Sequence, residues 1–267
     1  FDGNVSEHSL RHLAYAPSGA LWMLDEGGNA QFVHQDDGSV LLEGNVLDRV
    51  RSATGFTSSA ARPEENLLFA GTMSGEIFVL STTSAPYFVE ALPAEIDFGL
   101  VAAFSPAGEQ VAVASQFSAV HWGRRLPGGQ VAPLRPLTWP AAEGFAPQDT
   151  ALAFAPVSSD PPAASDGQER PDLAVGTWGG RIRLYGVTPG DEPLLEFEHA
   201  AGSYLNTLDF SPDGRYLLAG STGGEIDGVV ISRTLQLYQL EGPFTRWSVA
   251  GVNGLSILDT LWAADQQ

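Results

Sequence analysis

The chain has 267 residues, 43% hydrophobic and 17% charged, so it is long enough to bury a substantial core. It carries 32 acidic against 13 basic residues, and its net charge of −19 argues against nucleic acid or an anionic membrane surface as a partner. The absence of cysteine excludes disulfides and thiolate metal sites, and no apolar stretch is long enough to predict membrane insertion.

A short phrase recurs along the chain: a strand that ends in an aromatic residue, a Ser-Pro or Ala-Pro turn, and a second apolar strand. Its clear copies lie at residues 14–19, 103–108, 153–156 and 208–214, and a degenerate copy is placed at Phe56, where three hydroxyl residues replace the proline turn. The aromatic anchors lie 41 to 56 residues apart, at Tyr15, Phe56, Phe104, Phe154 and Phe210. A unit of about 40–45 residues with loop insertions is the period of a propeller blade.

Each unit is expected to contain four short strands separated by turns. The second strands are predicted at 20–24, 67–71, 111–114, 173–176 and 216–220. The third strands are predicted at 31–33, 77–80, 120–122, 182–185 and 235–238, and the fourth at 40–42, 87–90, 131–134, 194–197 and 246–249. Residues 57–66 and 157–171 are expected to be solvated loops between first and second strands, and 225–233 an insertion before a third strand.

The sequence therefore predicts an all-β chain, a single β-propeller domain over residues 1–267 with four-stranded antiparallel blades. Five complete repeats are expected at approximately 9–44, 50–93, 99–137, 149–198 and 204–250, followed by a partial sixth at 254–267. Three explanations of the unfinished repeat stay open. The ring closes with five or six blades, a partner supplies the missing strands, or the chain is a piece of a longer polypeptide.

The phrase Phe-Ser-Pro-Asp-Gly at 210–214 and the strand after it resemble the WD40-repeat family, in a bacterial form with degenerate repeats, over residues 9–263. TolB-like propellers share similar phrases. The WD40 resemblance implies that a hydroxyl near the end of the second strand links a loop histidine to a third-strand aromatic residue. The hydroxyl position holds Thr72, Ser115, Thr177 and Ser221, with Asp25 as the exception. The aromatic position holds Val33, Leu80, Trp122, Tyr185 and Tyr238, and the histidine is His199 or His8.

Chemical motifs are absent from the sequence. It contains no nucleophile elbow, zinc-protease motif, phosphate loop or dinucleotide fingerprint, and its five histidines lack ligand spacing, so no catalytic residue, metal or cofactor is expected. The alternative is a propeller enzyme, a glycan or small-molecule hydrolase whose central channel holds two carboxylates. Its candidates are Asp25, Glu26 and Asp209.

One residue per repeat follows the hydroxyl position and enters an equivalent turn. These residues are Glu26, Met73, Gln116, Trp178 and Thr222. The resemblance implies that such turns share the partner-binding face of a propeller. Trp178 is either a binding hot spot or a ring that covers the neighbouring glycines. Arg181 and Arg183 either pair with an acidic partner or are solvated, outward-facing strand residues.

The expected function is a noncatalytic protein–protein interaction scaffold, a domain or subunit of a larger bacterial assembly. Its protein partner is not identified by the sequence. The composition does not determine the compartment, and a cytoplasmic location is favoured over a secreted or periplasmic one.

Overall fold

The fold is seen in a computed structural model. It describes residues 10–15, 20–25, 27, 29–34, 39–45, 56–62, 67–72, 77–81, 88–92, 99–115, 120–124, 132–137, 149–156, 171–177, 179–186, 192–199, 204–222, 224–226, 229–231, 234–240 and 245–248. Every regular element among these residues is a β-strand. They form five four-stranded antiparallel sheets and one two-stranded ribbon, as the all-β prediction requires.

The first three sheets follow the chain order of their strands. The first contains β1 (Leu10–Tyr15), β2 (Ala20–Asp25), β3 (Asn29–His34) and β4 (Val40–Asn45). The second contains β5 (Phe56–Arg62), β6 (Leu67–Thr72), β7 (Ile77–Ser81) and β8 (Phe88–Leu92). The third contains β9 (Gly99–Phe104), β10 (Gln110–Ser115), β11 (His121–Arg124) and β12 (Arg135–Pro136).

The fourth sheet also follows chain order, whereas the fifth contains an insertion between its second and third strands. The fourth contains β13 (Asp149–Phe154), β14 (Leu173–Thr177), β15 (Arg181–Tyr185) and β16 (Leu195–Glu198). The fifth contains β17 (Tyr204–Phe210), β18 (Tyr216–Thr222), β21 (Leu235–Gln239) and β22 (Thr245–Ser248). Between β18 and β21 lies the separate ribbon of β19 (Gly224–Ile226) and β20 (Val229–Ile231).

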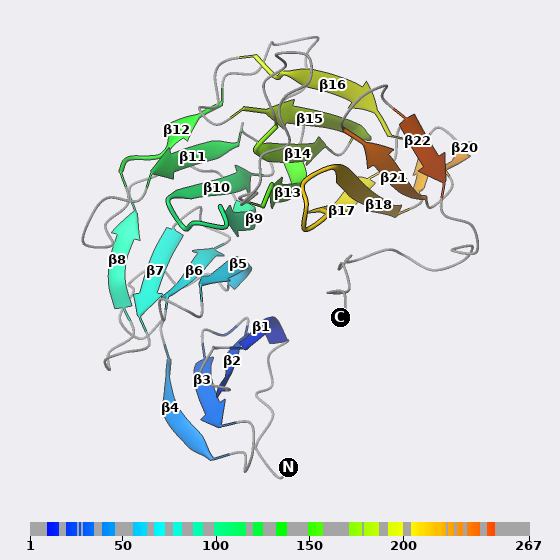
Figure 1. Cartoon of the computed structure of the whole chain (residues 1–267). Helices are drawn as coiled ribbons and strands as arrows, with labels where there is room; N and C mark the ends of the chain where they lie inside the picture. Colours follow the sequence, from blue (N-terminus) through cyan, green and yellow to red (C-terminus); the bar gives the residue numbers. More distant parts are fainter. Residues whose placement is uncertain are drawn as a thin grey trace.

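The sheets are arranged as an arc of blades, with the first strand of each sheet on the inside (Figure 1). The inner strands pack against one another in chain order, from β1 to β5, β9, β13 and β17. Among the described strands, β17 does not pack substantially against β1. The five sheets thus have the face-to-face arrangement of propeller blades.

The core lies between neighbouring sheets. One apolar cluster, which includes Leu152, Leu173 and Tyr185, lies between the third and fourth sheets. A second cluster, which includes Ile182 and Tyr238, lies between the fourth and fifth. Because each blade buries its faces against its neighbours, the stability of a blade depends on the blades beside it.

A β-bulge recurs on the first strand of all five described sheets, opposite the end of the second strand. The pairing skips one residue at each of these places: Arg11, Thr57, Leu100, Thr150 and Asn206. On the second strand, the residue whose partner comes immediately before the skipped one is Asp25, Thr72, Ser115, Thr177 or Ser221 in the five sheets. These five form the hydroxyl position of the sequence, so the bulge aligns the repeats independently of residue type.

This alignment corrects the second repeat. Phe56 begins β5 and pairs with Thr72, so it does not end a first strand, and the prediction of a solvated loop at 57–66 is wrong for 57–62. The strand continues to Arg62, which pairs with Leu67. The threonine and serines after Phe56 are compatible with a strand, and an aromatic residue can lie at either end of one. Residue type alone therefore did not fix the register of β5. The true counterpart of the aromatic anchor is Ala61.

The fourth strand of the third sheet is also displaced from its predicted position at 131–134. Regular pairing occurs at Arg135–Pro136, where Arg135 pairs with Trp122. Ala132 N–H donates to Arg124 C=O at 2.8 Å, so the chain already approaches β11 before the strand begins. Pro133 has no N–H to donate, which explains why a ladder does not run through these residues.

The Ser-Pro turn has the same hydrogen bonds in the third and fifth sheets. Ser211 Oγ accepts the Tyr216 N–H at 2.9 Å, and Ser105 Oγ accepts the Gln110 N–H at 3.0 Å. In the fifth sheet Ser211 also donates to Asp213 Oδ1 at 2.6 Å. The repeated phrase is therefore a repeated turn structure.

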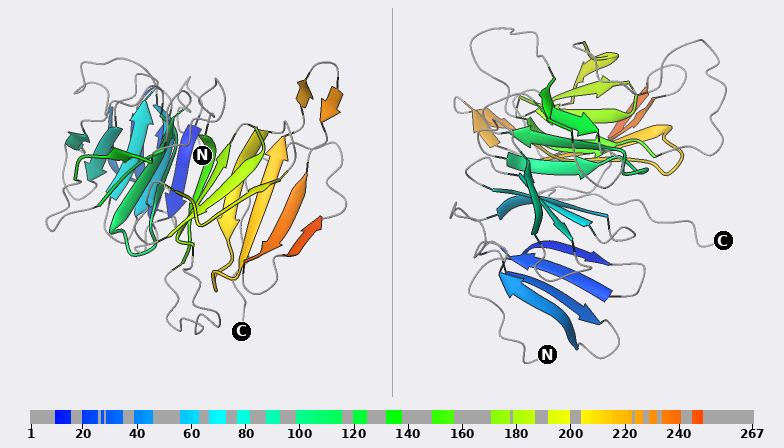
Figure 2. Two further views of the ribbon diagram at one scale, coloured as in Figure 1. Left: turned by 90° about the horizontal axis from the view of Figure 1, so that it is seen from above. Right: turned by 90° about the vertical axis from the view of Figure 1, so that its left-hand side faces the viewer.

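The predicted insertion at 225–233 forms part of the β19–β20 ribbon, in which Gly224 pairs with Ile231 and Ile226 with Val229. The ribbon extends beyond the ends of the neighbouring strands (Figure 2, left). The predicted loop 157–171, apart from Pro171, and the predicted sixth repeat at 254–267 lie outside the described residues.

Candidate partner-binding face and its supporting network

The turn from the second to the third strand is closed by the same hydrogen bond in the first and fourth sheets. Asp25 Oδ1 accepts the Asn29 N–H at 2.8 Å, and Thr177 Oγ1 accepts the Arg181 N–H at 3.1 Å. In both turns the two residues are four positions apart. A side-chain oxygen at the hydroxyl position thus fixes where the third strand begins, whether it comes from a hydroxyl or a carboxylate.

The fifth sheet keeps this hydrogen bond across the insertion. Ser221 Oγ accepts the Thr234 N–H at 3.2 Å although the two residues are 13 positions apart. The Ser221 N–H donates to Thr234 C=O at 2.9 Å, and the two hydroxyl oxygens lie 2.9 Å apart. Ser221 and Thr234 therefore hold together the two ends of the segment that carries β19 and β20.

This pair continues into a buried network that joins the fourth and fifth sheets. His199, which follows β16, is 2% exposed, and its Nε2 lies 2.7 Å from Thr234 Oγ1. Its Nδ1 lies 2.8 Å from the hydroxyl of Tyr238 on β21. The Tyr238 hydroxyl donates to Gln236 Oε1 at 2.6 Å. The chain of polar contacts runs from Ser221 through Thr234, His199 and Tyr238 to Gln236.

One assignment of protons satisfies the whole network. Because the Tyr238 hydroxyl donates to Gln236, its oxygen accepts from His199 Nδ1–H. In the neutral ring Nε2 is then the acceptor, so it accepts a hydrogen bond from the Thr234 hydroxyl. Thr234 Oγ1 in turn accepts a hydrogen bond from the Ser221 hydroxyl. This assignment requires an uncharged His199.

Burial keeps His199 in that uncharged form. Desolvation, reinforced by the positive charge of Arg246, lowers the pKa of His199 to about 4. Burial likewise raises the pKa of Tyr238 well above its usual value, so its hydroxyl stays protonated. The network is thus a neutral, fully hydrogen-bonded set of side chains near neutral pH.

Part of this network was predictable from the sequence. The family resemblance implied that the hydroxyl of Ser221 links His199 to Tyr238, but His199 contacts the Tyr238 hydroxyl directly, and Ser221 reaches His199 only through Thr234. His8, the other candidate, lies outside the described residues. Thr234 and Gln236 were missed, and no residue pattern marked Thr234, because the long insertion hides its closeness to Ser221.

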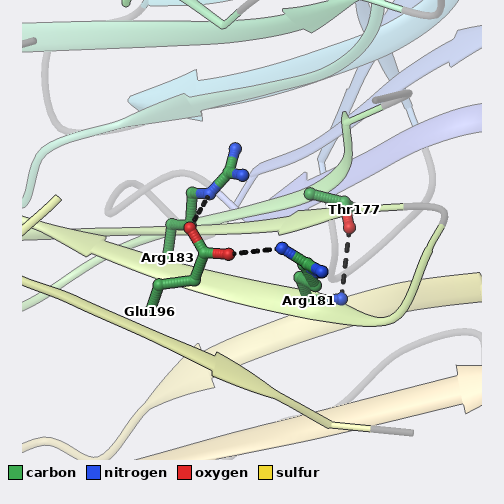
Figure 3. Close-up of polar contacts among 4 residues, drawn as sticks. All are labelled: Thr177, Arg181, Arg183 and Glu196. Atoms are coloured by element: carbon green, nitrogen blue, oxygen red, sulfur yellow. Dashed lines mark hydrogen bonds and ion pairs between the residues drawn. The ribbon is translucent and has the colours of Figure 1, made fainter. Parts of the chain in front are cut away.

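Arg181 is the member of the predicted face whose side-chain contacts are clearest (Figure 3). Its guanidinium lies 2.8 Å from Glu196 Oε1, and its side chain is 55% exposed. Arg183 holds the other oxygen of Glu196 at 2.6 Å, and its side chain is only 6% exposed, so the prediction of a solvated residue is wrong for Arg183. Burial opposes ionisation of Glu196, but the two arginines outweigh it and lower the carboxyl pKa. An acidic partner of Arg181 would have to share it with Glu196.

The other members of the face are less completely defined. Thr222 is half-buried at the end of β18, where it pairs with Tyr204 and leads into the β19–β20 segment. Glu26, Met73, Gln116 and Trp178 lie outside the described residues. Their predicted place on one face stays a prediction.

The two described candidates of the enzyme alternative, Asp25 and Asp209, lie in different sheets. Asp25 is buried, and its two oxygens accept the Asn29 backbone N–H and the Asn29 side-chain amide, at 2.8 and 2.7 Å. Asp209 lies in the fifth sheet, paired with Leu218, and Glu26 is outside the described residues. Among the described residues, no group of three or more His, Asp or Glu side chains could hold a metal ion.

The described residues include no helix with the length and apolar character that crossing a bilayer requires.

Comparison with solved structures identifies the fold. No family model matches the sequence, and no curated protein matches it. The β-propeller domain of Cps50 (Swd1) from Myceliophteria thermophila is similar to this chain, with a TM-score of 0.62 at 14% identity. The similarity covers 88% of this chain and 69% of that domain. A chain of a mitotic checkpoint complex is similar with a TM-score of 0.68 at 15% identity, over 95% of this chain and 68% of that one. The fold of this protein is therefore a WD40-like β-propeller.

Proposed function

We propose that this chain is a noncatalytic protein-binding scaffold that works as a domain or subunit of a larger assembly, bacterial as the form of its repeats suggests. In this proposal residues 1–267 make up one propeller domain. A partner protein binds the face formed by the turns between second and third strands, through Glu26, Met73, Gln116, Trp178, Arg181 and Thr222.

The observation that carries the proposal is the repeated bond that closes this turn. Asp25, Thr177 and Ser221 each fix the start of the third strand through the same backbone contact, in three different sheets. We infer that the residue after each of them lies at the same end of its blade. A rigid scaffold with variable residues at equivalent positions is suited to binding.

The comparisons add support of a different kind. One similar structure is a chain of a mitotic checkpoint complex, that is, a propeller within a protein assembly. The described sheets also form an arc in which β17 and β1 do not pack substantially together. We propose that strands from a partner, or from chain outside the five described sheets, complete the ring.

The test is affinity purification from extracts of the source organism with matched baits. The baits are the wild-type chain, the double variant Trp178→Ala/Met73→Ala, and Glu109→Ala. The last variant changes an exposed residue of the turn between a first and a second strand, at the other end of a blade. Thermal unfolding of all three establishes that the fold is kept.

The proposal predicts that the double variant loses a specific partner by about tenfold or more, as expected for a hot-spot residue, while Glu109→Ala retains it. If a correctly folded double variant keeps every wild-type partner, the binding face has been assigned to the wrong surface.

A further inference from the structure

The outer edge of the fourth sheet exposes two leucines. Leu194 is 43% exposed and Leu195 is 40% exposed, and these are the large hydrophobic side chains found exposed among the described residues. Leu195 begins β16, the last strand of its sheet. Phe197, two positions further, packs against the buried cluster between the fourth and fifth sheets. The apolar side of β16 therefore continues from the core to the surface.

The backbone of the same strand has hydrogen-bonding groups that β15 does not use. The His199 N–H donates to Gly180 C=O at 2.8 Å, so Gly180 and His199 form a hydrogen-bonded pair in the register of β15 and β16. Hydrogen-bonded pairs alternate along an antiparallel ladder, so Glu196, opposite Arg183 and three positions before His199, turns its N–H and C=O away from β15. The Leu194 N–H donates to Leu184 C=O at 2.7 Å, one residue out of this register, so the regular ladder ends at Leu195. The described sheet has no strand on that side of β16. An open edge of this kind is a template for one more strand.

The charge along this edge is negative. Glu192 and Glu198 are exposed, and neither carboxylate forms an ion pair with another described residue. The Glu196 carboxylate is held by Arg181 and Arg183, which keeps it ionised. Arg246 from β22 donates to Glu198 C=O at 3.4 Å, so the open part of the edge lies before Glu198.

We propose that the outer edge of β16 binds an extended segment of a partner protein, with alternating basic and apolar residues, as a fifth strand of this sheet. Alternate residues of an added strand would point to opposite faces. One face would place apolar residues beside Leu195, and the other would place basic residues near Glu192 and Glu198. Main-chain bonds to Glu196 would supply sequence-independent affinity.

Other occupants fit the edge less well. A second copy of this chain would bring together two surfaces of a molecule with net charge −19, and repulsion opposes that pairing. Nucleic acid and anionic lipid are opposed by the same charge. The edge uses none of the turn residues Met73 and Trp178, so this inference does not depend on the proposed turn face.

The experiment uses a defined probe, the fluorescein-labelled peptide acetyl-Lys-Val-Lys-Val-Lys-Val-Lys-amide, with the full chain. A second peptide has proline in place of the central valine, so it retains the charge but cannot extend a sheet. Fluorescence anisotropy is measured for the wild type, Leu195→Lys, Glu192→Lys and Trp178→Ala. Glu109→Lys is the matched control, because it makes the same charge change at an exposed residue of the third sheet.

We expect saturable binding of the first peptide, about tenfold weaker binding of the proline peptide, and about tenfold loss for Leu195→Lys and for Glu192→Lys. Glu109→Lys and Trp178→Ala should change the affinity by less than about twofold. Hydrogen exchange should slow at Glu196 when the first peptide is bound.

The inference is overturned if the wild type does not bind the peptide, or if the proline peptide binds equally well. It is also overturned if Glu109→Lys weakens binding as much as Glu192→Lys, because charge alone would then explain the affinity. Sedimentation provides one more test. A wild type that self-associates, together with a monomeric Leu195→Lys, would assign the edge to a second copy. The peptide measurement is independent of the extract experiment, because the double variant Trp178→Ala/Met73→Ala tests the turn face and not the edge of β16.

Discussion

Nδ1 of His199 lies 2.8 Å from the hydroxyl of Tyr238, and this contact joins the end of the fourth sheet to the third strand of the fifth. The histidine follows an outer strand, whereas the tyrosine is fully buried within the next blade. Blades of a propeller are held together mainly by apolar packing, so a directional contact between them fixes their relative position more narrowly.

Protonation of His199 should destabilise the protein. Its pKa in the fold is about 4, below the usual 6.5, so the unfolded chain binds the proton more tightly. Stability from the neutral ring is fully present above pH 6.5 and is lost as the pH falls towards 4. Relative to His199→Gln, the wild type should lose about 2 kcal/mol between pH 7 and pH 5. Urea unfolding of both proteins at the two pH values measures this difference. A constant difference would show that the ring does not change its proton affinity on folding.

Tyr238→Phe should cost about 1–3 kcal/mol of unfolding free energy, because it leaves His199 Nδ1–H and Gln236 Oε1 without this partner in a buried site. The ring itself, which packs 4.7 Å from Phe197 between centroids, is retained. Chemical denaturation at pH 7 tests the prediction. A cost below about 0.5 kcal/mol would mean that the hydroxyl contributes little to the network.

Gly176→Ala should destabilise the protein by about 1–3 kcal/mol through overpacking between the fourth and fifth sheets. An added Cβ would lie 3.1 Å from Leu205 Cβ and 3.3 Å from Ala151 Cβ. Gly179→Ala is the matched control, because its Cβ would have Thr177 Oγ1 at 3.9 Å as its close neighbour. Thermal unfolding of the two variants should separate clearly. Equal melting temperatures would contradict the tight contact between blades at Gly176.

Ser211→Ala should cost about 1–2 kcal/mol of unfolding free energy, because the Ser211 hydroxyl closes the turn between β17 and β18. The variant loses the bond from the Tyr216 N–H at 2.9 Å and the bond to Asp213 Oδ1 at 2.6 Å. Although partial burial opposes it, the Ser211 bond and the Arg215 N–H lower the Asp213 pKa. Urea unfolding at pH 7 measures the cost. A cost below about 0.5 kcal/mol would show that the hydroxyl contributes little to the turn.

The sequence predicted the architecture well because its turns are chemically distinctive. Proline and glycine after an aromatic strand end mark the hairpins, and Gly214, with φ of 70°, occupies the backbone region that this turn needs. Where that chemistry is missing, the prediction was wrong. The second repeat was placed out of register at Phe56, because no Ser-Pro turn marks the end of its first strand.

The supporting network was predictable only in part. His199 and Tyr238 were recognisable by their positions relative to neighbouring strands. Thr234 was not, because its role depends on a contact with Ser221 across 13 positions. The recurring bulges could not be predicted either, since the skipped residues include arginine, threonine, leucine and asparagine and share no side-chain property.

The most direct test of the proposed scaffold function is hydrogen exchange of the purified complex with the partner recovered in the extract experiment. We expect slowed exchange in the turns that contain Glu26, Met73, Gln116 and Trp178, and at the base of the β19–β20 segment near Thr222. Exchange at the opposite turns, such as residues 105–110, should be unchanged. Protection of residues 105–110 with none at the predicted turns would contradict the assignment of the partner-binding face.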